Sequence, residues 1–437
     1  MTSSAFQELA PELEVLSPLL LGGAGGQTAE PRAPSLRGAL RFWYRAIDPM
    51  FRHLAQRHES ESRPGRPSWE DRLFGGTVAG SGQSLLRVMV GPETRPPIKS
   101  WNRSVSIRSF DKPGGKFPRN GLGYLTYPLQ FRENADREFF QPGSRLSFRI
   151  VWPARDAEEW GPRIHRAALA TVWLLGAFGG LGMRSRRGLG SIAVTNWSEL
   201  IKSGTSELER DHAALPDLWS ARSPGEWAER AFAGLDVMET WFGSYRSNMD
   251  EKPEAPRHAH VGDIKLGPLP FGARSWDQAL SEAGLKLQDF RSRMPPDYEA
   301  VKAAVQARQH GQAPLRLAPR RAEFGLPLSF RFSSLREGTS MTFDGVREGR
   351  NGRKDRQEAI SVDRHASLLL IRLVRLGPLL HPVFIRLNGF EPGRDYPVQV
   401  RASRARDARH RSLHADEGRR AVVDEFMEWL AKGMKHG

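Results

Sequence analysis

The sequence has no cysteine among its 437 residues. This absence excludes disulfide bridges, zinc sites built on thiolates and catalysis by a thiol nucleophile. It is also compatible with a reducing compartment, and we expect a cytoplasmic protein. The segment 1–14 is polar and carries acidic side chains, unlike a secretory signal. The longest apolar run lies within 164–178 and contains His165 and Arg166, so it is too short and too polar to span a bilayer.

Sequence motifs of several enzyme classes are missing as well. No Gly-x-Ser-x-Gly nucleophile elbow and no His-Glu-x-x-His zinc motif occurs. The glycine-rich segments 22–28 and 179–190 lack the Gly-Lys-Ser/Thr ending of a phosphate-binding loop. The histidine pairs within 258–260 and 410–414 have no third ligand nearby. We therefore expect no catalytic residue, no metal and no cofactor.

Positive charge is abundant. Lys and Arg number 65 against 50 Asp and Glu, which gives a formal net charge of +15 and an isoelectric point near 10.4. The arginines are scattered through the sequence, which favours an extended surface that faces phosphates. A membrane is not expected as a partner, because no basic helix has a large apolar face. The apolar content of 39 % and charged content of 26 % are typical of a soluble globular protein.

The most informative segment is 179–190, Gly-Gly-Leu-Gly-Met-Arg-Ser-Arg-Arg-Gly-Leu-Gly. Its glycines allow positive φ angles and the close approach of another backbone. Its three arginines supply fixed charge and planar donors that suit phosphate. They are Arg184, Arg186 and Arg187. The segment follows an apolar helix and precedes a strand, so it is either a flexible phosphate-binding loop or a solvated turn.

A predicted helix begins at Pro34 and Ser35, with Ser35 as its N-cap. Its apolar stripe consists of Leu36, Leu40, Trp43 and Ile47. Its adjacent face is an exposed basic ridge of Arg37, Arg41 and Arg45. Such a ridge is more often simply solvated. The glycine turn 22–26 precedes the helix, and a helix N-terminus after such a turn favours anions.

The order of predicted elements in the first half indicates an α+β fold. Strands are expected at 13–21, 84–90, 146–152 and 191–194, with helices near 35–47 and 164–178. The order strand, helix, strand, strand, helix, strand is that of a ferredoxin-like unit. The segment 91–123 reads as a basic loop, and 203–216 reads as a linker.

The second half has a weaker pattern. Helices are expected at 224–245, 275–293 and 416–432, and strands at 328–332, 367–374 and 383–387. Basic stretches occur at 347–356 and 401–411. We therefore predict two domains, an N-terminal ferredoxin-like domain at 1–200 and a diverged copy with a helical insertion at 201–437.

Several of these segments together resemble the RAMP superfamily, the RNA-binding subunits of CRISPR effector complexes. The glycine–arginine loop after a helix is similar to the C-terminal RAMP signature. Residues 16–23 and 32–46 resemble the first subunit of the Cmr complex, the type III-B effector. Further matching segments follow in the expected order at 73–75, 123–129 and 142–144. The second half matches mainly at 364–368.

The resemblance implies two RAMP domains and a non-catalytic subunit that holds the 3′ part of the guide RNA and helps to capture complementary target RNA. Other RAMP subunits are its expected partners. The residues implied in RNA binding are Ser35, Arg37, Gly38, Arg41 and Arg45 on the first helix, and Gly182, Arg184, Ser185, Arg186, Arg187 and Gly188 in the loop. Base pairing reads the sequence in such complexes, while basic loops hold the backbone.

Two alternatives remain open from the residues. The first is a metal-independent RAMP endoribonuclease that processes guide precursors, with His365 beside Arg364 as its candidate base. The second is a nucleotide-binding metabolic enzyme that uses the turn 22–26. The missing phosphate-loop lysine and the large positive charge argue against it.

Overall fold

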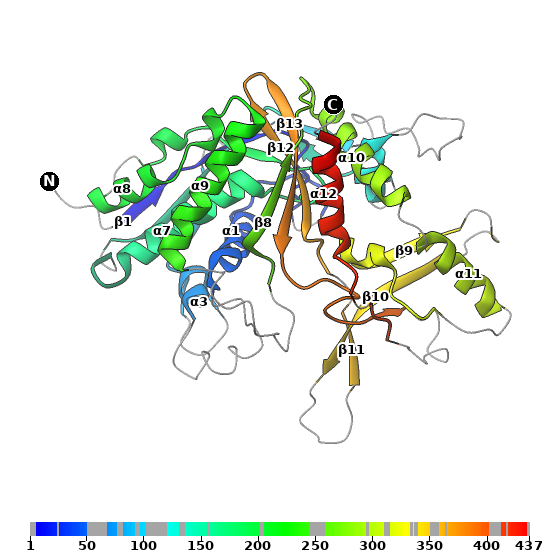
Figure 1. Ribbon diagram of the computed structural model, residues 1–437. Coiled ribbons are helices and arrows are strands. Elements are labelled where there is room, and N and C mark those ends of the chain that lie inside the picture. The colour runs from blue at the N-terminus through cyan, green and yellow to red at the C-terminus, as the bar shows by residue number, and fades with distance from the viewer. Residues whose placement is uncertain are drawn as a thin grey trace. The chain divides into compact units, whose positions relative to one another are not determined.

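The computed structural model describes residues 6–23, 26–49, 68–76, 82–91, 97–101, 120–130, 136–154, 157–201, 205–243, 258–293, 297–309, 315–332, 335, 340–349, 358–362, 365–401, 412–416 and 418–434. The chain divides into two compact units, each with helices and strands (Figure 1), as expected of an α+β protein. The first unit comprises Met1–Lys286 and Leu370–Ile385, and the second comprises Leu287–Leu369 and Arg386–Gly437.

The first unit contains an antiparallel five-stranded sheet. Its strands are β1 (Phe6–Leu9), β2 (Glu12–Val15), β3 (Arg87–Val90), β6 (Arg145–Pro153) and β7 (Ile192–Val194). The long strand β6 pairs with β3 on one side and with β1 and β2, in succession, on the other. Strand β2 in turn pairs with β7. Across the sheet the order is therefore β3, β6, the β1–β2 pair, and β7.

Strand β6 illustrates why this sheet forms. Its sequence alternates, so Leu146, Phe148 and Ile150 are fully buried while Arg145 and Arg149 are exposed on the other face. A period of two places the apolar side chains against the core and the charged ones towards solvent. The strand expected at 146–152 is confirmed by this element.

The strand expected at 13–21 is wrong beyond Val15, where β2 ends. Pro18 has no N–H to donate to a sheet, and Ser17 uses its hydroxyl to donate to the carbonyl of Gly188 at 2.6 Å. The chain therefore leaves the sheet, and Leu19 makes only an isolated bridge to Phe140.

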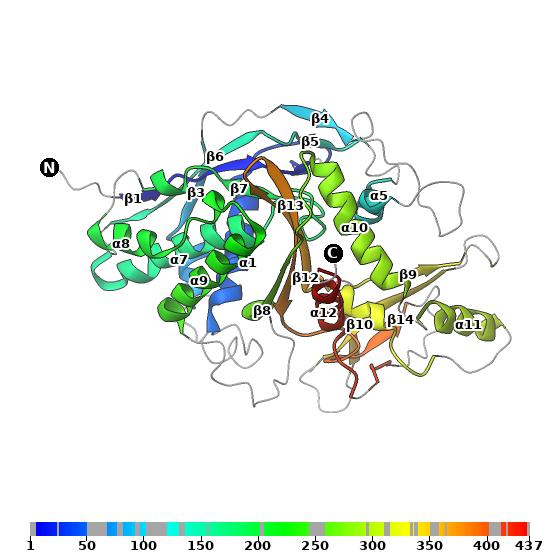
Figure 2. The ribbon, with the colours of Figure 1, turned by 45° about the horizontal axis from the view of Figure 1, so that its top comes forward.

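Two long helices and two shorter ones accompany this sheet. They are α1 (Ala33–Ile47), α7 (Ala157–Phe178), α8 (Ser206–Ala214) and α9 (Pro224–Phe242). Helix α1 packs against α7, and α7 packs against α8 and α9. Figure 2 shows these helices along one face of the sheet. The rings of Trp173 and Trp227 both meet Phe178 edge-on at the core of this layer.

Two local expectations in this layer are wrong. Helix α1 begins at Ala33 with Arg32 as its N-cap, so Ser35 lies inside the helix and caps nothing. Pro34 fits the first turn because the N–H it lacks has no intrahelical partner there. The expected linker 203–216 contains α8, which is capped by Thr205 and buries Leu208.

The remaining elements lie wholly or mostly in the first unit. They are α3 (Trp69–Phe74), β4 (Ile98–Ser100), α5 (Gly121–Thr126), β5 (Glu138–Phe140), β8 (His260–Pro268), α10 (Trp276–Ser292), β12 (Leu369–Leu376) and β13 (Leu379–Asn388). Strands β12, β13 and β8 form a three-stranded sheet in that order, and β4 pairs with β5. Of the expected loop 91–123, residues 92–96 and 102–119 lie outside the described residues.

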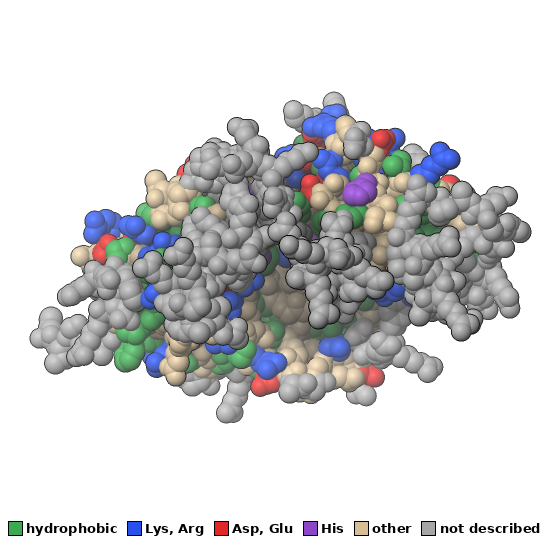
Figure 3. All heavy atoms as spheres, turned by 90° about the horizontal axis from the view of Figure 1, so that it is seen from below, with side chains coloured by type: hydrophobic (Ala, Val, Ile, Leu, Met, Phe, Trp, Pro, Cys, Tyr) green, Lys and Arg blue, Asp and Glu red, His purple; other side chains and the backbone are tan. Residues whose placement is uncertain are grey.

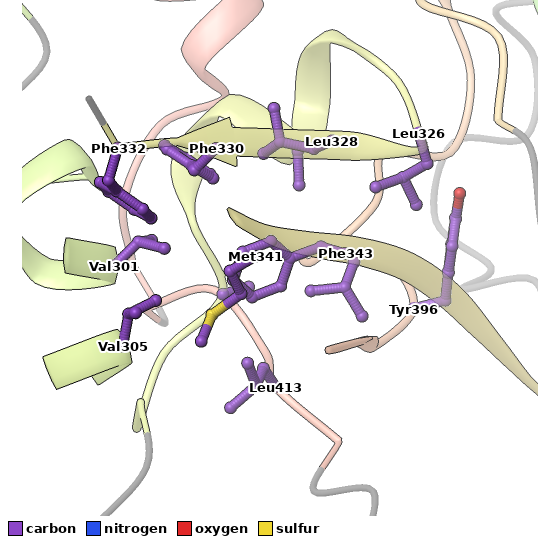
Figure 4. Packing of buried hydrophobic residues seen from close by; sticks show 13 residues of the cluster. Val301, Val305, Leu326, Leu328, Phe330, Phe332, Met341, Phe343, Tyr396 and Leu413 are labelled. Carbon is purple, nitrogen blue, oxygen red and sulfur yellow. The ribbon is translucent and has the colours of Figure 1, made fainter. Parts of the chain in front are cut away.

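The second unit is built around another antiparallel sheet. Its elements are α11 (Asp297–Gln309), β9 (Leu328–Arg331), β10 (Ser340–Gly349), β11 (Glu358–Val362), β14 (Val398–Val400) and α12 (Val422–Met434). Strand β10 pairs with β9, β11 and β14. Figure 4 shows Val301 and Val305 of α11 beside Phe332 and Met341, which form part of the core of this unit.

The last helix, α12, begins at Val422, later than the predicted start at 416. Most of the two predicted basic stretches, at 350–356 and 402–411, and Arg364 lie outside the described residues. Among the residues that are described, no helix is long and apolar enough to cross a membrane.

Candidate nucleic-acid interface

The glycine–arginine loop 179–190 is held in place by backbone hydrogen bonds on one side. The N–H of Met183 donates to the carbonyl of Leu20 at 2.9 Å, and the N–H of Gly190 donates to that of Pro18 at 2.9 Å. Within the loop, Leu181 donates to Gly190 at 3.0 Å. The prediction of a flexible loop is therefore wrong for the backbone, which is hydrogen-bonded to the segment after β2.

Strand β12 holds the same loop from the other side. The N–H of Ile371 donates to the carbonyl of Arg186 at 3.1 Å. The fully buried guanidinium of Arg372 donates to the carbonyl of Gly179 at 3.2 Å and to that of Ile192 at 2.7 Å. Burial lowers the pKa of Arg372 to about 9, so it remains charged at neutral pH. Arg372 was not among the predicted site residues, because an arginine inside an apolar run carries no signal of its partner.

Two glycines of the loop are required by close approach. Gly182 has a φ of +76°, and a Cβ there would lie 2.3 Å from the carbonyl oxygen of Leu20. Gly188 has a φ of +92°, and a Cβ there would lie 2.3 Å from a methyl carbon of Leu280. At both positions the positive φ favours glycine, and at Gly182 the backbone of Leu20 also leaves no room for a Cβ. Gly182 itself is exposed, whereas Gly188 is buried.

The three loop arginines have different environments. Arg184 donates from Nε to the carbonyl of Leu125 at 3.1 Å, and burial lowers its pKa to about 10. Arg186 lies with its guanidinium 5.0 Å from the ring centre of Phe42, and burial also lowers its pKa to about 10. Both are protonated at neutral pH, but much of their surface packs against protein. Arg187 and Ser185 are half-buried.

The loop and helix α1 meet through Phe42. Its ring contacts both the Arg186 guanidinium and the ring of His258, whose centre is 4.8 Å away. Burial, together with Arg45 and Arg186, lowers the pKa of His258 to about 4, so this histidine is neutral at pH 7. The structure thus brings together the two segments that the sequence analysis singled out separately.

The expected basic ridge on α1 is exposed only at Arg37. Arg41 and Arg45 are half-buried, and both form ion pairs with the buried carboxylate of Glu70 on α3. Arg41 also donates to the carbonyl of Gly75 at 3.1 Å. The prediction of an exposed ridge is therefore wrong for these two, whose charge is partly neutralised by Glu70. At Gly38 nothing lies within 4 Å of a built Cβ, so this face of α1 is open.

A surface hollow of about 730 Å³ lies beside the first turns of α1. Arg37, Arg41 and Arg87 line it, together with the backbone of Gly75 and Gly76. The exposed Arg87 on β3 was not singled out from the sequence, although the alternation of its strand places it on the outer face. Figure 3 shows lysine and arginine side chains recurring over the described part of one face of the molecule.

The alternative catalytic candidate, His365, lies in the second unit. Its backbone N–H donates to the carbonyl of Leu326 at 3.1 Å, and its carbonyl accepts from Leu326 at 2.9 Å. Its ring lies 5.6 Å from that of Tyr396. Among the described residues, no group of three or more histidine or acidic side chains is arranged to hold a metal ion.

Part of the chain is similar to known proteins. Residues 12–193 match the model of the RAMP superfamily, a range that contains α1, the hollow and the loop 179–190. The CRISPR system Cmr subunit Cmr1-1 of Pyrococcus furiosus is 27 % identical over 276 residues, which cover 62 % of this chain and 68 % of that protein. Cmr1-2 of the same organism is 26 % identical over 200 residues, covering 44 % and 96 %.

A solved structure shows a similar fold. The crystal structure of Cmr1 from Pyrococcus furiosus in its apo form aligns with a TM-score of 0.51 at 18 % identity, covering 98 % of this chain and 97 % of that one. Together these comparisons confirm the resemblance to the RAMP superfamily and to the first subunit of Cmr complexes.

Proposed function

From the match of residues 12–193 to the RAMP superfamily, we propose that this chain is a Cmr1-type subunit of a type III-B CRISPR effector complex. It binds guide RNA, holds the 3′ part of the guide and aids the capture of complementary target RNA in antiviral defence. Its other partners are the RAMP subunits of the complex, and it acts in the cytoplasm. The observation that carries this proposal is the family match, which spans both α1 and the loop 179–190.

The geometry supports phosphate contact at particular residues. Arg37 and Arg87 are exposed around one hollow, and Gly38 leaves the neighbouring face of α1 open. Arg187 adds charge from a loop whose backbone is held on both sides. Fixed backbone donors and arginines bind phosphates without reading bases. We assign the phosphate contacts to the exposed Arg37, Gly38 and Arg87 and to the half-buried Arg187. Arg41, Arg45, Arg184 and Arg186 then hold this surface in shape, while Ser35, Gly182, Ser185 and Gly188 position its backbone.

We also propose that the chain carries two ferredoxin-like domains, with the division near residue 200. The sheet order β3, β6, β1–β2, β7 supports the first, because two helices, α1 and α7, separate its strands in the ferredoxin-like manner. Chain order supports the second. Once residues 293–368 and the short strand β14 are set aside, β8, α10, β12, β13 and α12 follow as strand, helix, strand, strand, helix.

The proposed role is binding and not catalysis. The relatives named above are described as complex subunits and not as enzymes. The ring of His365, the candidate base of the endoribonuclease alternative, packs beside that of Tyr396, with 5.6 Å between the ring centres. Incubating the protein with repeat-containing RNA tests this directly. If the protein cleaves this RNA specifically and His365→Ala abolishes the cleavage, the endoribonuclease alternative is correct and the purely binding role is wrong.

RNA affinity measured against salt tests the interface. We expect the triple variant Arg37→Gln, Arg87→Gln, Arg187→Gln to bind single-stranded RNA more weakly for all sequences alike. Its salt slope should fall by about 0.7 for each phosphate that the variant no longer neutralises. The control variant changes three exposed arginines elsewhere in the first unit, Arg210, Arg222 and Arg274, to Gln.

The control has the same net charge as the test variant, so a general charge effect would weaken both equally. If the wild type and the folded test variant have the same RNA affinity and the same salt slope, these three arginines are not part of the RNA interface.

A further inference from the structure

A cavity of about 280 Å³ lies wholly within the second unit, apart from the interface proposed above. Five arginines line it. They are Arg316, Arg320, Arg394, Arg419 and Arg420. Such a concentration of guanidinium groups around one hollow points to an anionic ligand, because planar forked donors match phosphate oxygens.

The three acidic side chains that also line this cavity offset only part of the charge of its five arginines. Asp297 accepts the backbone N–H groups of Arg320 at 3.0 Å and Arg321 at 2.7 Å. Asp416 pairs with Arg419 at 2.9 Å. Glu323 is buried and accepts the N–H of Val422 at 2.5 Å. Burial and the neighbouring Glu391 raise the pKa of Glu323 to about 8, so it is mostly neutral at pH 7.

Helix α12 and its flanking turn hold several of the arginines in place. Arg320 pairs with Glu425 at 2.7 Å, and Arg420 donates to Glu428 at 2.8 Å. Neither glutamate lines the cavity. A guanidinium has five N–H donors, so an ion pair on one edge fixes the group and leaves donors for a ligand. The exposed Arg316 forms no ion pair with any carboxylate among the described residues.

An apolar wall completes the cavity. Val301, labelled in Figure 4, and Ala318 belong both to its lining and to the buried core of this unit, and Leu317 at its rim is 48 % exposed. A volume of about 280 Å³ exceeds what a bare phosphate fills and is close to the lower end, roughly 300 Å³, of small-molecule sites. The ligand therefore has an apolar or aromatic part beside its charge.

We propose that this cavity binds the phosphate monoester of a nucleotide, with the phosphate among the arginines and the nucleoside against Leu317. A monoester carries close to two negative charges at neutral pH, against one for a phosphodiester, so it gains more from five arginines. The same chemistry is present in a free mononucleotide and at a phosphorylated end of an RNA chain.

Binding of defined probes to the full-length protein tests this site. The probes are adenosine 5′-monophosphate, adenosine, and short RNAs that end in a phosphate or in a hydroxyl. We expect the monophosphate to bind at least roughly tenfold more tightly than adenosine. The double variant Arg316→Gln, Arg419→Gln should remove that preference, because both arginines line the cavity. Both side chains are exposed, so we expect the fold to tolerate their loss.

The matched control is Arg210→Gln with Arg222→Gln, which has the same net charge and should bind like the wild type. Preference for phosphate-ended RNA that is lost in the test variant identifies an RNA end as the ligand. Preference for the mononucleotide alone identifies a free nucleotide.

Absence of any phosphate preference, or a preference unchanged in the test variant, would overturn the proposal. The RNA interface of the first unit is tested by other residues, so either proposal can fail without the other.

Discussion

The guanidinium of Arg372 donates a hydrogen bond of 2.7 Å to the backbone carbonyl of Ile192. This bond joins β12 to the start of β7, which directly follows the glycine–arginine loop. A second bond from the same guanidinium, to Gly179, reaches the other end of the loop. One buried side chain therefore fixes both ends of the loop, and the positions of Arg184, Arg186 and Arg187 depend on it.

Replacing this arginine should destabilise the protein. In Arg372→Met the carbonyls of Gly179 and Ile192 lose their buried donor, and each unsatisfied group costs about 1–3 kcal/mol. We expect a correspondingly lower denaturation midpoint in guanidinium chloride. The control is Arg375→Gln on the same strand, whose half-exposed pair with Glu14 contributes about 0–1 kcal/mol. Equal midpoints for the two variants would contradict the role of Arg372.

The glycines of the interface allow a matched pair of substitutions. Gly182→Ala places a Cβ 2.3 Å from the carbonyl oxygen of Leu20 at a φ of +76°, so we expect a loss of about 1–3 kcal/mol. Gly38→Ala places its Cβ in open space inside α1, where alanine is favoured over glycine by about 0.5–1 kcal/mol. Thermal unfolding of both variants measures the difference. If the unfolding temperature shifts in the same direction in both variants, this interpretation of the two glycines is contradicted.

Much of the local structure could be predicted from the sequence, because it follows from short-range patterns. The alternation in 146–152 placed β6, and the apolar stripe from Leu36 to Ile47 placed α1. The boundaries were less accurate where a single residue competes, as with Ser35, which lies inside the helix that it was expected to cap.

The environments of the charged residues could not be predicted, because they depend on partners distant in sequence. Arg41 lies 29 residues, and Arg45 25 residues, before the glutamate they share. Nothing in the charge pattern of α1 indicates that Glu70 will lie against this helix. Likewise, Phe42 and Arg186 gave no sequence signal that they would meet. A basic ridge and a basic loop were therefore both expected to be exposed, with no contact predicted between them.

The raised pKa of Glu323 makes the stability of the fold depend on pH. Its ordinary pKa of 4.5 rises to about 8 through burial and the nearby Glu391, against the opposing effects of the Val422 N–H and of Arg394 and Arg320. Between these two values the folded chain holds a proton that the unfolded chain has released. The free energy of unfolding should therefore fall as pH rises through this window, by at most about 1.4 kcal/mol per pH unit for this group.

Glu323→Gln removes that titration while retaining a side chain of similar shape. We expect the variant to lose less stability than the wild type between pH 5 and pH 8, with the difference growing towards pH 8. Part of the slope should remain, because burial also raises the pKa of Glu391, to about 7. Chemical denaturation at several pH values measures both curves, and Glu299→Gln on the exposed face of α11 is the control. Parallel curves for the wild type and Glu323→Gln would mean that Glu323 is already ionised at neutral pH. The cavity beside it would then carry one additional negative charge, which its arginines would have to offset.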